Sequence, residues 1–341
     1  MKLLNGNMNS KTLLLIMAFV FSGFLKSQGQ LADSIKLHID SSLAVLENNS
    51  LYAKNVSWPD IRRRVYASAS SVTTKAETFA ALKIAFDALG DKHAAYYQYD
   101  DEYRIPNNAL LARYTDSIKA TWKKGSRIVK QMIGTNAYVR VPFMGAGKQE
   151  DIDKYANWLN DAVAELQKND PASWIIDLRL NSGGNIRPML AGLASFFEDG
   201  VVGYCIERDG SATDESAFSN GNFTIDGISQ AIIKNKIPSL TKTKVAVLIG
   251  PGTASSGEGV AVVFRQRKQT KLFGEQSAGL ANATNGFVFN NNNSYFLLSV
   301  ANLGDKNKKA LPEYVAPDVI VKSNDAFNDL SRDTVVQEAI R

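Results

Sequence analysis

The stretch KVAVLIGPGTASSGEGVAVVF, residues 244–264, decides the fold of this chain. Residues 244–250 are an apolar run that predicts a buried strand, and residues 260–264 are apolar with a helical pattern. The turn between them, TASSGE at residues 253–258, consists mostly of small residues. A serine hydroxyl there is unshielded and lies beside helix N-terminal amides, so Ser255 is a candidate nucleophile. Serine is also a favoured helix N-cap, and the stretch alone leaves both roles open.

Strands alternate with helices on both sides of this stretch. The alternation over about 190 residues predicts an α/β domain with a largely parallel central sheet from residue 137 onward. Two β-prone runs separated by an asparagine turn, residues 286–290 and 294–301, predict a hairpin. The expected strands are residues 137–142, 174–180, 201–207, 245–250 and 271–274, and the expected helices are residues 150–167 and 188–197.

The first part of the chain has a different character. Residues 31–90 follow helical patterns and predict a small helical subdomain in front of the α/β domain, with Gly90 placed to end its last helix. Before it, Lys2 and Lys11 flank the apolar run 13–25, which is too short for a stable transmembrane helix. Residues 1–29 therefore predict a secretory signal peptide and an exported protein, periplasmic or extracellular, without a membrane span once the signal is removed.

Charge and composition exclude several classes of function. The formal charge of +5 falls to +2 once residues 1–29, with three lysines and no acidic residue, are removed, which does not support nucleic-acid binding. Cys205 is the only cysteine, so neither an intrachain disulfide nor a thiolate zinc cluster is expected. Two histidines without an H-E-x-x-H motif do not predict a catalytic zinc, and no phosphate-cradling or dinucleotide motif predicts a cofactor.

Three further places could carry chemistry. His93 follows a helix end in a loop, where it is either a solvated side chain or one presented to a cleft. Gly183 and Gly184 follow a buried strand and form either a plain turn or an oxyanion hole, whose amides must approach a ligand closely. Glu313 precedes a short strand, residues 318–321, and taken alone it reads as a surface carboxylate.

Taken in chain order, these segments resemble the family of the C-terminal processing (tail-specific) proteases, the tricorn core and interphotoreceptor retinoid-binding protein. The resemblance implies a fold like that of crotonase and ClpP enzymes, with a central β-sheet and flanking helices, preceded by the helical subdomain. Six boxes in the correct order carry it: residues 89–93 (LGDKH), 138–143, 177–184 (DLRLNSGG), 253–258 (TASSGE), 274–279 (GEQSAG) and 317–321 (PDVIV).

The resemblance also implies roles for residues. Ser255 takes the nucleophile position, and the backbone N–H groups of Ser256 and of Gly183 or Gly184 would form the oxyanion hole. The lysine base of the processing proteases lies 25 residues after the nucleophile, where this chain has Leu280. The tricorn-like branch instead uses a histidine oriented by a glutamate, and His93 and Glu313 match these positions.

The residue patterns and the resemblance together divide the chain into a predicted signal peptide (1–29), a helical subdomain (30–93), a connecting segment (94–136) and a catalytic core (137–341). The connecting segment is too short for the PDZ domain of the processing proteases. Where the tricorn-like branch commonly has a serine before its histidine, this chain has Lys92.

These features together predict a secreted serine endopeptidase that acts on peptides or unfolded proteins without metal or cofactor. The alternative is a non-catalytic binding protein on the same scaffold, for a hydrophobic ligand or a peptide. Lys92 motivates this alternative, because a cation beside His93 disfavours the imidazolium. Acyl-CoA chemistry of the crotonase type is less favoured, because export would separate the protein from cytoplasmic CoA. The oligomeric state is left open.

Overall fold

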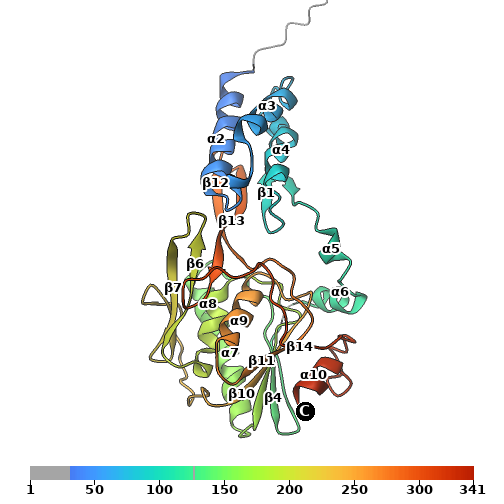
Figure 1. Cartoon of the computed structure of the whole chain (residues 1–341), viewed down its shortest axis with the longest axis vertical. Coiled ribbons are helices and arrows are strands. Elements are labelled where there is room, and N and C mark those ends of the chain that lie inside the picture. Colours follow the sequence, from blue (N-terminus) through green and yellow to red (C-terminus); the bar gives the residue numbers. More distant parts are fainter. Residues whose placement is uncertain (1–30, 126) are drawn as a thin grey trace, which may run out of the picture.

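The computed structural model describes residues 31–125 and 127–341, and it shows a narrow helical part joined to a broad α/β part (Figure 1). The predicted signal peptide, residues 1–29, lies outside the described residues. Within the described ranges, no helix is both long and apolar enough to span a bilayer. The α/β prediction with a central sheet and flanking helices is confirmed by this architecture.

The central sheet has six strands in the order β14-β11-β10-β5-β4-β3. All neighbouring pairs are parallel except β3 and β4, which form an antiparallel pair. β3 comes from the segment 94–136, which also contains two short helices, α5 (Asn108–Leu111) and α6 (Asp116–Lys123). The strands are β3 (Val129–Ile133), β4 (Asn136–Arg140), β5 (Ser173–Asp177), β10 (Lys244–Ile249), β11 (Thr270–Gly274) and β14 (Val319–Ile320).

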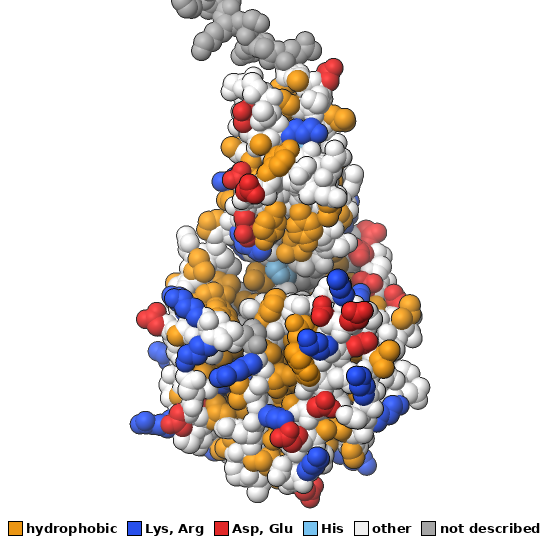
Figure 2. All heavy atoms as spheres, turned by 180° about the vertical axis from the view of Figure 1, so that it is seen from behind, with side chains coloured by type: hydrophobic (Ala, Val, Ile, Leu, Met, Phe, Trp, Pro, Cys, Tyr) orange, Lys and Arg blue, Asp and Glu red, His pale blue; other side chains and the backbone are white. Residues whose placement is uncertain are grey.

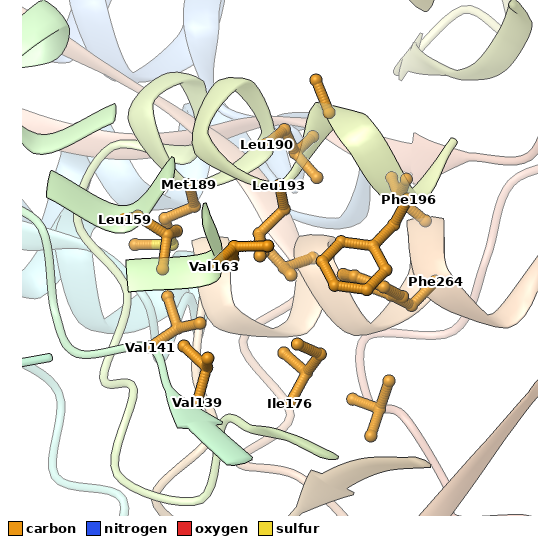
Figure 3. Packing of buried hydrophobic residues seen from close by; sticks show 14 of the residues in the cluster. Val139, Val141, Leu159, Val163, Ile176, Met189, Leu190, Leu193, Phe196 and Phe264 are labelled. Carbon is orange, nitrogen blue, oxygen red and sulfur yellow. The ribbon is translucent and has the colours of Figure 1, made fainter. Parts of the chain in front are cut away.

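Successive side chains of a strand point to opposite faces of the sheet, and in these strands both sets are apolar. Helices therefore cover both faces of this sheet. On one face, Val139 and Ile176 pack under α7 (Gln149–Gln167), α8 (Ile186–Gly192) and α9 (Ser256–Arg265), as Figure 3 shows. After α8 a single 3₁₀ turn, η4 (Ala194–Phe196), replaces the rest of the expected helix 188–197. On the other face, Tyr138 and Leu248 pack against α10 (Thr334–Ala339).

A second, antiparallel sheet of eight strands joins the two parts. The sequence predicts its hairpin and its strand at residues 201–207, but not that they form a sheet separate from the central one. Strand β13 of the second sheet pairs with β1 near the helices and with β6 in the broad part, so one strand runs through both. β12 and β13 form the expected hairpin. The strands are β1 (Ala95–Gln98), β2 (Asp101–Tyr103), β6 (Gly200–Glu207), β7 (Ala212–Ser219), β8 (Asn222–Ile225), β9 (Ile228–Ser229), β12 (Asn282–Phe289) and β13 (Ser294–Gly304).

The narrow part has its own core, formed by three helices and the β12–β13 hairpin. Phe296 and Leu298 of β13 lie among the buried side chains of the helices, such as Leu43 and Phe86. The last helix ends at Gly90, whose φ of +69° is the left-handed conformation expected of it. The helices are α2 (Asp33–Asn49), α3 (Trp58–Ser68) and α4 (Phe79–Leu89), with 3₁₀ turns η2 (Ala53–Asn55) and η3 (Ala76–Thr78).

A buried ion network fixes the C-terminal helix to the sheet. Arg179 is 2% exposed and donates to the carboxylates of Asp177 (2.8 Å) and Asp333 (2.9 Å). Burial disfavours the charged form of Asp177, but Arg179 and Arg140 outweigh it and hold the pKa of this carboxyl below its ordinary value. Asp333 is also the N-cap of α10, accepting from the amides of Val335 and Val336. This network therefore links the DLRLNSGG segment to the end of the chain.

We expect Asp333→Asn to lower the free energy of unfolding by roughly 3 kcal/mol, because it leaves the buried Arg179 with one carboxylate instead of two. Asparagine keeps the oxygen that caps α10, so the decrease in stability measures the effect of removing the negative charge of Asp333. The control is Glu338→Gln in the same helix, whose partner Arg341 is 76% exposed, and it should change stability by less than about 1 kcal/mol. Urea unfolding of the three proteins measures both values, and equal stabilities would contradict the importance of the network.

Candidate active site

Ser255 lies at the turn between β10 and α9, as the sequence predicts. It is the N-cap residue of α9 and has φ +53° and ψ −121°, a backbone conformation that side-chain-bearing residues rarely adopt. Ser255 is half-buried, and within the described residues its hydroxyl donates no hydrogen bond. The N-cap and the nucleophile alternatives are thus compatible, because one turn places the serine at a helix N-terminus and leaves its hydroxyl available.

The paired glycines lie directly against this serine. Gly183 and Gly184 have φ of +106° and +102°, and a Cβ on Gly183 would lie 2.7 Å from the Cβ of Ser255. The amide of Gly183 donates to Asn181 Oδ1 (2.9 Å), so it is already engaged. The hydroxyl of Ser256 donates to the carbonyl of Gly184 (2.7 Å), which joins the two loops.

Two amides near Ser255 are available for a ligand. Across the described chain, neither the N–H of Gly184 nor the N–H of Ser256 has an acceptor within the protein. Ser256 is the first residue of α9, where the amides of a helix are normally unpaired. Such a pair of free amides can stabilise an oxyanion formed at Ser255. Of the two glycines, Gly184 fits this role, whereas the amide of Gly183 is held by Asn181.

Glu258 anchors the serine loop from inside. Its buried carboxylate accepts from the amide of Ser255 (2.8 Å), the hydroxyl of Ser277 (2.5 Å) and the amides of Gly279 (2.9 Å) and Leu280 (3.0 Å). Burial raises the pKa of Glu258 to about 7, even though these four donors favour the ionised form. The segment in which the processing proteases carry their lysine base thus contributes backbone amides to a carboxylate here.

His93 lies in the loop between α4 and β1, in the narrow part. Its backbone amide donates to Asp91 Oδ1 (3.0 Å), and Asp91 also accepts from the amide (2.9 Å) and hydroxyl (3.0 Å) of Ser299 in β13. The ring Nδ1 of His93 is buried and has no hydrogen-bond partner within the described residues. Burial, with a smaller contribution from the charge of Arg104, lowers the pKa of His93 to about 4, and the charge of Glu313 opposes this shift.

Lys92 does not act on His93 as the sequence suggested. Its ammonium group donates to the carbonyl of Pro106 (3.2 Å) at the surface. The cation that influences the imidazole is Arg104, which is also held by Glu102 (2.9 Å). The cation that disfavours the imidazolium is therefore Arg104 rather than Lys92.

Glu313 is exposed and belongs to the loop before β14. Its carboxylate accepts from the hydroxyl of Tyr52 (2.5 Å), and its carbonyl accepts from the amide of Ala281 (2.9 Å). Glu313 is close enough to His93 for its charge to affect the imidazole pKa, but no hydrogen bond joins the two side chains. Nor does any hydrogen bond join His93 to Ser255 among the described residues.

The predicted residues thus fall into two groups. Ser255, Ser256, Gly183 and Gly184 form one contiguous site, and His93 and Glu313 meet where the narrow part joins the broad part. The space-filling view shows the surface hollowed at this junction, with hydrophobic side chains on both sides of the hollow (Figure 2). The sequence did not identify Tyr52 and Asp91 as residues of the site. Asp91, two residues before His93, fits a local turn motif, whereas no pattern in the sequence connects Tyr52 with Glu313.

A cavity of about 600 Å³ opens beside Ser255, Ser256 and Gly184. Cys205 also lines this cavity, but burial raises the pKa of its thiol to about 12, so the thiol stays neutral and does not compete as a nucleophile. Apolar side chains supply much of the wall: Ile186, Leu190, Val202, Val262, Val263 and Leu303. In the part of the chain that the structure describes, no group of three or more His, Cys, Asp or Glu residues could hold a metal ion.

The pKa of Glu258 predicts a pH dependence of stability. Between pH 4.5 and about 7 the folded protein keeps a proton that the unfolded chain loses, so the free energy of unfolding falls as pH rises through this window. We expect Glu258 to contribute a decrease of about 3 kcal/mol. Glu258→Gln should be less stable overall, because the NH₂ group of glutamine would face the hydrogen-bond donors that now bind the carboxylate. Its free energy of unfolding should, however, lack the pH-dependent decrease that Glu258 contributes. Urea unfolding of both proteins between pH 4 and 8 tests this prediction. An equal pH dependence of the free energy of unfolding in the wild type and in Glu258→Gln would refute it.

Comparison with known proteins shows which proteins the chain resembles. The chain is 25% identical over 283 residues to the nisin-resistance protein of Lactococcus lactis subsp. lactis, covering 83% of this chain and 82% of that protein. A lipoprotein from Streptococcus agalactiae has a similar structure, with a TM-score of 0.64 and 18% identity over 86% of this chain and 93% of the other. So has the photosystem II D1 C-terminal processing protease, with a TM-score of 0.62 and 14% identity over 90% and 98%.

The resemblance stated from the sequence is confirmed at the level of the family. The model of peptidase family S41 matches residues 135–321, more than half of the chain, and this range includes both the serine loop and the paired glycines. The chain shares the fold of the photosystem II D1 C-terminal processing protease. The chain belongs to peptidase family S41.

Proposed function

We propose that this protein is an exported serine endopeptidase that cleaves peptides or unfolded proteins. The observation that carries the proposal is the contact of Ser255 with the loop of Gly183 and Gly184, which gives an available hydroxyl beside two unpaired amides in one cavity. A nucleophile and oxyanion donors in one water-accessible site are what acyl transfer requires.

In the proposed mechanism, the Oγ of Ser255 attacks the scissile carbonyl, and His93 accepts the hydroxyl proton. The N–H groups of Gly184 and Ser256 stabilise the resulting oxyanion. His93 then protonates the leaving amine, and water hydrolyses the acyl-enzyme through the same base. Glu313 orients the imidazole and stabilises its charged form. This sequence requires His93 to reach Ser255, and catalytic hydrogen bonds commonly tighten only when substrate binds.

Export is part of the proposal. The segment at residues 1–29 has the features of a secretory signal, and two relatives are a lipoprotein and a nisin-resistance protein. The name of the second makes nisin one substrate to test beside unfolded proteins.

One observation favours a second candidate, a non-catalytic binding protein for a peptide or a hydrophobic ligand. The imidazole of His93 makes no hydrogen bond to Ser255 or Glu313, while the cavity beside Ser255 offers both apolar and polar groups to a ligand. In that case a ligand would bind with equal affinity to the wild type and to Ser255→Ala, and no turnover would be measured.

We expect Ser255→Ala to abolish hydrolysis of unfolded casein and labelling by a fluorophosphonate, because both need the serine oxygen as nucleophile. The control is Ser216→Ala, which removes another hydroxyl from the wall of the same cavity and should leave both activities intact. Mass spectrometry locates the label. Modification of Ser256 instead of Ser255, or full hydrolysis by Ser255→Ala, would refute the assignment.

The pH dependence of kcat/KM tests whether His93 is the general base. Because burial lowers the pKa of His93 to about 4, the imidazole stays neutral far below pH 6.5, and the acid limb of kcat/KM should lie near pH 4. Arg104→Gln removes a cation that lowers this pKa, so the limb should move to higher pH. Lys92→Gln, at the residue beside His93, should leave the limb in place. A limb near pH 6.5 in the wild type, or equal shifts in both variants, would contradict this account.

A further inference from the structure

In the part of the chain that the structure describes, one side-chain hydrogen bond connects the narrow part to Glu313 of the proposed active site. The hydroxyl of Tyr52, in the segment that follows α2, donates to Oε1 of Glu313 at 2.5 Å. The two residues are 261 positions apart in the chain, so tertiary folding alone brings them together. Among the described residues, no other side chain or amide donates to the Glu313 carboxylate. Tyr52 is therefore the group that fixes where this exposed carboxylate lies.

Tyr52 and His93 are held to the same residue of the long strand β13. The amide of Leu51 donates to the carbonyl of Ser299 (2.8 Å), which places Tyr52. The amide and hydroxyl of Ser299 donate to Asp91, which in turn holds the backbone of His93. Tyr52 and His93 are thus both attached, through Leu51 and Asp91, to Ser299. This shared attachment fixes the position of Tyr52 relative to His93.

The charges around His93 make Glu313 the group on which its protonation depends. Arg104 acts to lower its pKa and Glu313 acts to raise it, Asp91 is occupied by backbone and serine donors, and Lys92 points to the surface. Burial and the bond to Glu313 raise the pKa of the Tyr52 phenol, so it stays a proton donor at any working pH. With Oε1 bound to Tyr52, the second oxygen of Glu313 is available to the imidazole.

We infer that Tyr52 is a positioning residue of the peptidase site, which holds Glu313 where its carboxylate can orient His93 and stabilise the imidazolium. This inference rests on the proposed function, because it assigns His93 as the base. The helical part then has a role in the reaction beyond its own stability, since it supplies both the base and the side chain that places the base's partner.

Two other contacts provide matched controls. Lys54 donates to the carbonyl of Arg208 (3.1 Å), so Lys54→Gln removes a different tether between the two parts without touching Glu313. Tyr66 donates to Asp40 (2.6 Å) within the helical part, so Tyr66→Phe removes the same kind of phenol–carboxylate bond away from the cleft.

The experiment measures kcat, KM and the imidazole pKa in Tyr52→Phe. We expect kcat to fall about tenfold with KM nearly unchanged, as for loss of one hydrogen bond to a charged group. The pKa of His93 should also fall, since Glu313 is released toward solvent. The chain has only two histidines, His38 and His93, so NMR of labelled imidazoles follows each one directly. Tyr66→Phe and Lys54→Gln should change neither kcat nor the titration of His93.

If Tyr52 acts only through Glu313, the effects of substituting the two residues should not add. Glu313→Gln should lower the pKa of His93 in the same direction, and adding Tyr52→Phe to it should have no further effect on kcat or titration. Additive losses, an unchanged His93 titration in Tyr52→Phe, or an equal effect of Tyr66→Phe or Lys54→Gln would overturn the inference. If the wild type hydrolyses nothing, the proposed function fails, while the NMR titrations still decide whether Tyr52 acts on His93 through Glu313.

Discussion

The site depends on one buried carboxylate. Glu258 lies under the serine loop, and its two oxygens accept from Ser255 and from three groups of the segment 277–280. A serine held at φ +53° is strained, and the backbone keeps this conformation only because the surrounding structure leaves it no alternative. Glu258 supplies that constraint from below, and the Gly183 loop packs against the serine from above.

The parts of the site that the sequence predicted are those built from local signals. The turn around Ser255 and the pair Gly183 and Gly184 follow buried strands, and parallel neighbouring strands β5 and β10 place both turns at the same sheet edge. Which glycine amide is free could not be predicted, because it depends on the side chain of Asn181 turning back to Gly183. The relation between Tyr52 and Glu313 gave no signal either, because it arises only from long-range packing.

The same distinction applies to the fold. The central sheet could be predicted because its strands are apolar runs bounded by turns and helices. Strands β7 and β3 could not be predicted, since β7 of the second sheet reads ATDESAFS and resembles a polar loop, and β3 at the exposed edge of the central sheet reads VKQMI. These strands are specified by their neighbours, β6 and β4, rather than by their own composition.

The path of β13 through both parts has a consequence for biosynthesis. The helices α2 to α4 leave the ribosome first, but their core includes Phe296 and Leu298, which are made more than 200 residues later. Until then the apolar faces of these helices lack the surface that covers them. The narrow part therefore completes its packing only late in synthesis, although it is the first described region to be translated. In the cell, this order favours a chaperone that shields the helices until the hairpin arrives.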